Sequence, residues 1–239
     1  MNLTVHKLNA DVDGKKVVRN VSFSVRPGEV HVIMGHNGSG KTSLLNSIMG
    51  HPKFEHKSGS VKLGNSYVTK LPPHEKAKKG LFLSMQHVPE IEGITLAYFL
   101  YTTNKELNEE TKKIVDFYAE VKGLARTFGI DEQFLDRPLN HGLSGGEKKQ
   151  SEILQLLLLR PRFALLDEID SGVDLDSLRK VQKAVSNLRR EGTGFVIVTH
   201  NPDVAKKLKP DVVHLMKSGA ITQSGDTDIL NRIRKEGSL

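Results

Sequence analysis

The stretch GHNGSGKT, residues 35–42, constrains the fold of this chain more than any other feature. It matches the phosphate-binding pattern G-x-x-x-x-G-K-[ST], and it lies between an apolar strand-like run at 29–34 and a helical segment from Lys41 to about Met49. Glycines let backbone N–H groups approach phosphate oxygens closely, and the helix start adds its positive dipole. A glycine-rich turn that only caps a helix is the alternative. The strand–loop–helix order favours a nucleotide-binding loop.

The pattern assigns the loop residues roles in binding a nucleoside triphosphate. Lys41 is expected to reach the β- and γ-phosphates, and Thr42 to ligate Mg²⁺. The remaining positions are expected to surround the phosphates: Gly35, His36, Asn37, Gly38, Ser39 and Gly40. A nucleoside triphosphate with Mg²⁺ is the predicted ligand, and the phosphate chemistry alone does not distinguish ATP from GTP.

A second candidate site element is FALLDE, residues 163–168, in which an apolar run ends in two acids. In a P-loop protein a neighbouring strand delivers such an Asp to the metal. Asp167 is therefore expected to hold Mg²⁺ through water, and Glu168 to polarise the attacking water. The alternative is an acidic loop that caps a helix after a core strand.

Strand-like and helical runs alternate along the chain, which predicts an α/β fold with a largely parallel sheet. Two half-exposed strands are expected at 3–8 and 17–25, and a hairpin at 211–216 and 220–225. Residues 94–160 are mostly helical in pattern, so a helical insert divides the α/β core. The other expected elements are strands at 58–64, 81–86, 163–167 and 195–200 and a helix at 174–190.

Composition excludes several functions. The chain has no cysteine, so neither disulfides nor cysteine-ligated metal sites can form within it. Its net charge of +7 comes from scattered Lys and Arg, and aromatic residues make up 5%, which argues against a nucleic-acid partner. No apolar run approaches the ~20 residues that span a bilayer, and no signal peptide is recognisable, so we expect a cytoplasmic protein without direct membrane insertion.

LSGGEKKQ, residues 143–150, resembles the signature motif LSGGQ of ABC-type ATPases, with Glu147 at its last position. The resemblance runs from Leu3 to about Gly225. It implies a P-loop NTPase fold with a RecA-like core, an N-terminal antiparallel β subdomain and an inserted α-helical subdomain. In one ABC ATPase domain of residues 1–239, residues 1–86 and 161–239 would form the core, and 87–160 the helical subdomain that carries the signature.

The resemblance also implies an ATP-dependent homodimer. In the family, the signature residues bind the γ-phosphate that the other protomer holds, and they correspond here to Ser144, Gly145 and Gly146. SGVD at 171–174 resembles the D-loop, so Asp174 is expected at the dimer interface.

Two further positions match family residues that act in hydrolysis. Gln86 matches the Q-loop glutamine, which contacts Mg²⁺ and the nucleophilic water, and His200 matches the switch histidine, which touches the γ-phosphate. Taken alone, His200 could be an ordinary polar strand end. The turn at 9–18 lacks the aromatic that stacks on adenine in many members, and Val12 or Val18 is the expected substitute.

Within the family, four segments resemble the SufC subfamily, the ATPase of the SUF machinery of iron–sulfur cluster assembly. The segments are 86–96, 144–155, 167–178 and 210–226. Transporter subunits more often read DEP where this chain has DEID, so Ile169 and Asp170 replace the usual Pro-Thr or Pro-Phe. The resemblance implies that ATP-driven dimerisation changes the conformation of a SufB/SufD-type scaffold docked near residues 87–140.

Two other functions remain open at this point. The chain could be the ATP-binding energy subunit of a membrane ABC transporter, docking on cytoplasmic loops of a permease. It could also be a clamp that binds nucleotide without turnover. The clamp is disfavoured because Gln86, Glu168 and His200 are all present.

Overall fold

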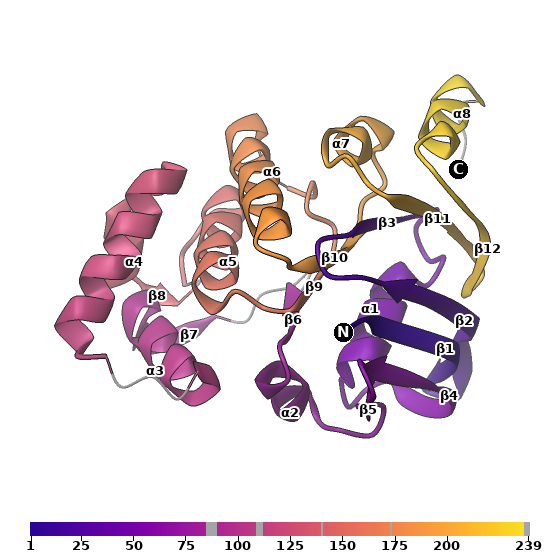
Figure 1. Ribbon diagram of the computed structural model, residues 1–239. Coiled ribbons are helices and arrows are strands. Elements are labelled where there is room, and N and C mark those ends of the chain that lie inside the picture. Colours follow the sequence, from indigo (N-terminus) through magenta and orange to yellow (C-terminus); the bar gives the residue numbers. More distant parts are fainter. Residues whose placement is uncertain (85–89, 109–111, 140, 173, 237–239) are drawn as a thin grey trace. The chain divides into compact units, whose positions relative to one another are not determined.

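The computed structural model describes residues 1–84, 90–108, 112–139, 141–172 and 174–236, and it divides into two compact units (Figure 1). The first unit comprises Met1–Gln86, Pro161–Asp170 and Arg189–Leu239. The second comprises His87–Arg160 and Ser171–Leu188, so it also includes a segment, 171–188, that the sequence analysis assigned to the core.

An antiparallel sheet of order β2-β1-β4-β5 opens the first unit. The predicted strands at 3–8 and 17–25 form, and both are longer than expected because the hairpin turns at Asp13 and Gly14. Burial alternates along both strands, which places one face of the sheet against the core. The bounds are β1 Leu3–Val12, β2 Lys15–Val25, β4 Glu55–Leu63 and β5 Ser66–Tyr67.

The second sheet of this unit has the order β12-β11-β3-β10-β9-β6. Its neighbours pair in parallel except β11 and β12, which form the predicted C-terminal hairpin. The strands β3, β9 and β10 are buried at every position, as expected for parallel strands covered on both faces. The bounds are β3 Val30–Met34, β6 Leu81–Ser84, β9 Phe163–Leu166, β10 Gly194–Val198, β11 Val212–Lys217 and β12 Ala220–Gly225.

Helix α1, Lys41–Met49, packs in one hydrophobic cluster with strands of both sheets. Leu44, Leu45 and Ile48 are fully buried in that cluster, each worth ~2 kcal/mol of burial. The helix ends as predicted at Gly50, which takes a left-handed conformation. The fully buried Lys76 donates from Nζ to the Ile48 carbonyl, 2.8 Å away, so a cation supports the carboxyl end of this helix.

Three short helices of the first unit were not predicted. They are α2 Pro73–Lys78, α7 Pro202–Lys207 and α8 Asp228–Glu236. Proline occupies the first turn of α2 and α7, where its missing N–H is tolerated. With six residues each, α2 and α7 are too short to produce a helical period in the sequence.

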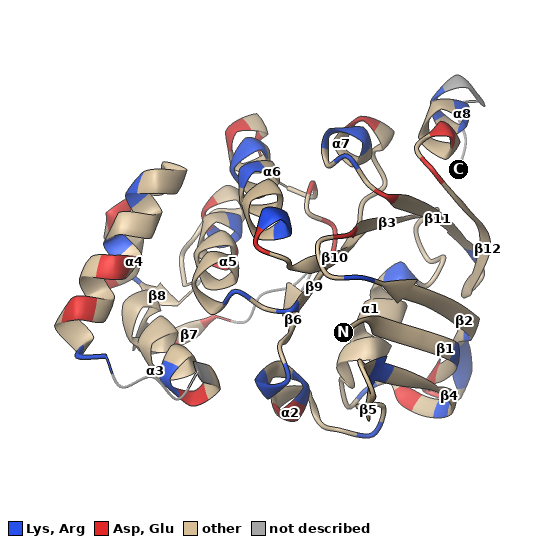
Figure 2. Cartoon of the chain, in the orientation of Figure 1, with Lys and Arg blue, Asp and Glu red and all other residues tan. Residues whose placement is uncertain are grey.

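The second unit is mainly helical, as predicted for residues 94–160. Its helices are α3 Leu96–Asn108, α4 Ile114–Phe128, the 3₁₀ helix η1 Glu132–Asp136, α5 Gly145–Leu159 and α6 Leu175–Arg190, of which the last two residues belong to the first unit. Two short strands, β7 Ile91–Thr95 and β8 Pro138–Leu139, were not predicted. Basic and acidic residues both occur along α4 and α6 (Figure 2). In the described ranges, no helix is long and apolar enough to cross a membrane.

Candidate nucleotide-binding site

Three adjacent strands of the parallel sheet end in candidate site residues. The phosphate-binding loop follows β3, Asp167 and Glu168 follow β9, and His200 follows β10, which lies between β3 and β9 (Figure 1). Ligands of open α/β sheets bind at the carboxyl ends of the strands. The topology therefore brings three sequence-predicted elements to one edge of the first unit.

The loop leaves the start of α1 open to an anion. The N-cap residue Gly40 has a φ of 102° and provides no side-chain cap, so the first N–H groups of the helix have no acceptor within it. Gly35 could not be another residue, because a Cβ there would lie 2.2 Å from the Met216 carbonyl oxygen. Backbone donors at a helix start and a close-packed glycine turn are the features that hold phosphate.

Lys41 lies inside this loop. Its side chain is buried, and Nζ donates to the carbonyls of Gly35 at 2.7 Å and His36 at 2.9 Å. Burial lowers the pKa of Lys41, while the charges of Glu168 and Asp167 oppose that shift. The ammonium group is thus held where phosphate oxygens could replace the two loop carbonyls as its acceptors.

The two acids after β9 differ in their surroundings. Asp167 is 1% exposed, and its N–H donates to the Ser84 carbonyl across the β6–β9 pair. Glu168 is partly exposed, and its backbone φ is 44°, an angle that residues other than glycine rarely adopt. Such strained residues cluster at functional sites, where the surrounding fold enforces them.

The oxygen donors of this edge fit Mg²⁺. The Thr42 hydroxyl and the Asp167 carboxylate are the kind of hard ligands that Mg²⁺ takes in small number, with water and substrate phosphate completing its shell. No group of three or more His, Asp or Glu side chains in the described ranges could hold a metal on its own. The donor set therefore fits a metal that arrives with a nucleotide better than a permanently caged ion.

The turn between β11 and β12 supports the loop, and the sequence analysis missed this role. The Gly219 N–H donates to the Ser39 carbonyl at 2.8 Å, and the Gly219 carbonyl accepts from the Arg19 N–H at 2.8 Å. A Cβ at Gly219 would meet the Val17 carbonyl at 2.7 Å. The sequence predicted the hairpin, but the contact of Gly219 at its tip with Ser39, 180 residues earlier, has no local signal.

The signature motif forms the start of α5 in the second unit. Ser144 is the N-cap, its hydroxyl accepts from the Glu147 N–H, and the Glu147 carboxylate accepts from the Ser144 N–H at 2.7 Å. This is a complete capping box. It gives a physical reason for Glu at the last motif position, and its bonds hold the pKa of Glu147 below its usual range.

The D-loop residue Asp174 lies against this motif within the second unit. A Cβ on Gly146 would be 2.9 Å from Asp174 Oδ2, and one on Gly145 would be 2.6 Å from the Gly172 carbonyl. Asp174 accepts from the Ser177 N–H at 2.7 Å at the start of α6, which lowers its pKa. Glycine is therefore required at 145 by contact with the Gly172 backbone, and at 146 the Asp174 side chain leaves little room for a Cβ.

Some predicted positions are placed differently or lie outside the description. Gln86 falls outside the described residues. Val18 is fully buried, so the expectation that it could pack against the base is wrong, because a side chain enclosed by the β sheet cannot face a ligand. Val12 at the end of β1 is half-buried, and Phe23 of β2 is a core residue.

Comparisons with known proteins identify the family. The sequence profile of the family described as ABC transporter matches residues 18–171. A Bacillus subtilis protein named vegetative protein 296 is 39% identical over 98% of this chain and 91% of its own length. A probable ABC transporter ATP-binding protein of Streptococcus pyogenes is 42% identical over 98% and 93%. A probable ATP-dependent transporter of Cyanidium caldarium is 38% identical over 98% and 94%.

Solved structures share the fold at lower identity. The ATP-binding subunit of an ABC transporter superposes with a TM-score of 0.82 at 22% identity, covering 99% of this chain and 94% of that one. A dimeric bacterial ABC transporter cassette gives 0.82 at 21%, covering 95% and 99%. The chain belongs to the ABC transporter family, and it is an ATP-binding cassette, a P-loop ATPase that binds ATP with Mg²⁺.

Proposed function

We propose that the chain hydrolyses ATP at the interface of a homodimer and uses the cycle to change the conformation of a partner protein. The observation that carries this proposal is the convergence of Lys41, Asp167 and Glu168 at the carboxyl ends of β3 and β9. A buried ammonium and two acids beside an uncapped helix start suit phosphoryl transfer to water.

Each residue has a distinct part in the proposed reaction. Lys41 binds the β- and γ-phosphates, together with the backbone N–H groups of residues 35–42. Thr42 and Asp167 hold Mg²⁺, which neutralises phosphate charge when bound. Glu168 orients and polarises the attacking water, and His200 contacts the γ-phosphate. We assign Gln86 to the metal and the water on the resemblance alone.

The second protomer completes the site in this proposal. Ser144, Gly145 and Gly146 would bind the γ-phosphate held by the partner subunit, and Asp174 would contact the partner through the D-loop. The N–H groups at the start of α5 suit an anion. In the proposed domain division, Ser144, Gly145 and Gly146 belong to the helical subdomain at 87–160, and Asp174 belongs to the core part at 161–239.

We propose a SufB/SufD-type scaffold of iron–sulfur cluster assembly as the partner, docked near residues 87–140. The support is sequence resemblance: the segments 144–155, 167–178 and 210–226 follow the SufC pattern. ATP-driven closure of two cassettes would deform the scaffold where a cluster is built. A chain without cysteine would supply motion, and the cluster ligands would come from the scaffold.

The second candidate partner is a membrane permease. The printed names of several relatives favour it, since they describe a probable ABC transporter ATP-binding protein and a probable ATP-dependent transporter. Because the ATPase chemistry is the same with both partners, a measurement of hydrolysis cannot distinguish them. Both partners would also be met in the cytoplasm.

Purification of the tagged chain from its native cells, with and without detergent, separates the two candidates. The Glu168→Gln variant in Mg-ATP keeps the proposed dimer closed, and mass spectrometry identifies the proteins that copurify. Soluble SufB/SufD-type proteins recovered without detergent support the scaffold. Recovery of a membrane permease alone, and only with detergent, contradicts it and supports the transporter function.

A further inference from the structure

Asp170 is connected to the segment that carries His200 by a short chain of hydrogen bonds within the first unit. The Thr199 hydroxyl donates to Asp170 Oδ2 at 2.9 Å and accepts from the Asn201 N–H at 3.0 Å. Thr199 and Asn201 flank His200 on both sides. The Thr199 hydroxyl thus links Asp170, at the end of the acidic segment, to the backbone of Asn201, so both neighbours of the histidine take part in this chain.

Further hydrogen bonds hold residues 199–201 against β3 and at the start of α7. The Thr199 N–H donates to the Ile33 carbonyl of β3, and the Asn201 side chain accepts from the N–H groups of Asp203 and Val204 as the cap of α7. His200 itself is exposed. Its backbone is therefore fixed by its neighbours, while its ring remains available to a ligand.

The hydrogen-bond inventory of Thr199 explains why an acceptor is needed at position 170. Thr199 is fully buried, and its hydroxyl has one proton, which it gives to Asp170. Removal of the carboxylate would leave that proton without its acceptor in a place that water does not reach. The hydroxyl could then rotate away, and the Asn201 N–H would lose its fixed acceptor.

We propose that Asp170 is a positioning residue for hydrolysis, which holds His200 toward the γ-phosphate through Thr199. The inference rests on the proposed role of His200. Asp170 does not touch the substrate in this account. Transporter subunits usually carry Thr or Phe after DEP, at the position that Asp170 occupies in DEID. Neither of those residues offers a carboxylate that could accept the Thr199 hydrogen bond.

The test compares steady-state ATP hydrolysis of four variants. Asp170→Ala and Thr199→Val each remove the same bond, and both are expected to lower kcat about tenfold with little change in KM, since a bond to a charged group is lost. Asp170→Asn retains an acceptor oxygen and is expected to keep most of the turnover. Thr193→Val is the matched control, because Thr193 is also buried and its hydroxyl donates to the Pro161 carbonyl at the other end of β10.

A second arm places the Asp170→Ala change in a His200→Ala background. If Asp170 acts through the histidine, the double variant is expected to hydrolyse ATP no more slowly than His200→Ala alone. A further tenfold fall in the double variant, or an equal fall in Thr193→Val, would overturn the inference. Thr199→Val and Asp170→Asn carry the test if Asp170→Ala does not fold.

The result for His200→Ala separates this inference from the proposed function. Wild-type turnover in that variant would refute the role of His200, and the inference would fall with it. A large loss in His200→Ala, combined with wild-type turnover in Asp170→Ala and Thr199→Val, would refute only the positioning role of Asp170.

Discussion

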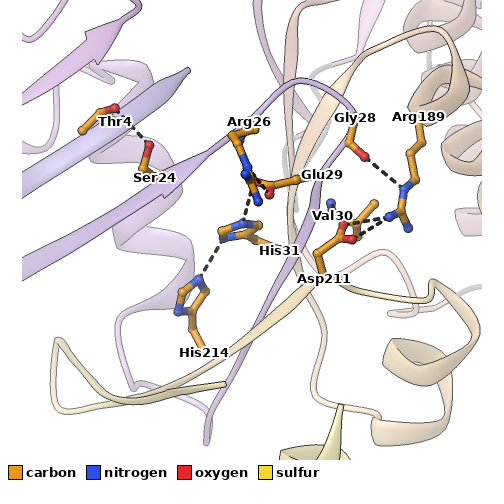
Figure 3. Close-up of polar contacts among 10 residues, drawn as sticks. All are labelled: Thr4, Ser24, Arg26, Gly28, Glu29, Val30, His31, Arg189, Asp211 and His214. Carbon is orange, nitrogen blue, oxygen red and sulfur yellow. Dashed lines mark hydrogen bonds and ion pairs between the residues drawn. The ribbon is translucent and has the colours of Figure 1, made fainter. Parts of the chain in front are cut away.

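Two buried histidines make the stability of the first unit sensitive to acid. His31 of β3 and His214 of β11 lie on neighbouring strands, with His31 Nδ1 3.0 Å from His214 Nε2 (Figure 3). His214 Nδ1 is 2.7 Å from the Ser224 hydroxyl, and His31 Nε2 is 3.5 Å from a Glu29 carboxylate oxygen. With one proton on each ring, every one of these pairs can have a donor and an acceptor. A second proton on His214 would add a positive charge to a ring that is buried beside His31.

The magnitude follows from the pKa of His214. Burial, and then the neighbouring charge of His31, lower the pKa of His214 from 6.5 to about 4. Between these values the unfolded chain binds the proton and the folded chain does not, so stability falls as the pH decreases and levels off below about 4. With a pKa of 6.5 in the unfolded chain and about 4 in the folded chain, the free energy of unfolding is about 2 kcal/mol lower at pH 5 than at neutral pH.

His31 adds to this acid sensitivity in the same direction. Burial lowers its pKa, against the charges of Glu29 and Asp211, which raise it, and Arg26 acts with burial. Arg189 pairs with Asp211 nearby at 2.7 Å, so the surrounding charges are largely compensated (Figure 3). Neutral imidazoles are therefore favoured at this position at neutral pH.

Urea unfolding of wild type and His214→Gln at pH 7.5 and pH 5.0 tests this reasoning. Glutamine retains a donor and an acceptor but does not titrate. We expect the variant to be less stable at pH 7.5, because it loses packing against Phe23, whose ring centroid is 5.5 Å away. The deficit is expected to shrink by about 2 kcal/mol at pH 5. His6→Gln at an exposed position is the control. A deficit that stays equal at both pH values would refute the reasoning.

Three other outcomes follow from the same contacts. Lys41→Ala is expected to weaken Mg-ATP binding at least tenfold, measured by calorimetry, because the buried ammonium of the loop is lost. Ser144→Ala is expected to cost about 1 kcal/mol of unfolding free energy in urea, because the capping box of α5 is broken. Burial lowers the pKa of Lys76 to about 8, so the unfolded chain holds the extra proton between pH 8 and 10.5 and stability is expected to rise with pH there. Lys76→Met is expected to abolish that rise in urea titrations.

The sequence predicted the parts of the fold that have a local signal. The loop at 35–42, the helix from Lys41 and the hairpin at the end of the chain all form where their residue patterns predict. The short helices α2 and α7 were missed because six residues give too little periodicity. The strands β7 and β8 are short and pair irregularly, so they too lack a clear alternation.

The motifs of the candidate site could be predicted from the sequence, but the contacts that hold these motifs in place could not. The motif residues can be recognised by their spacing along the chain, as in GHNGSGKT and FALLDE. The contacts that hold them come from distant segments: Gly219 supports Ser39, and Thr199 meets Asp170. Such contacts depend on strand order, which a single sequence does not encode locally. The sequence around Asp170 offers only a resemblance, whereas its hydrogen bond with Thr199 offers a physical role.

In the proposed reaction, Glu168 activates water for hydrolysis of ATP. The most direct measurement is the initial rate of phosphate release at saturating Mg-ATP, for wild type and for Glu168→Gln. Glutamine preserves the size of the side chain and removes its charge, so nucleotide binding is expected to remain largely intact and the ATP-bound dimer to be favoured. We expect a rate at least ~100-fold below wild type. A rate close to wild type would contradict this role of Glu168.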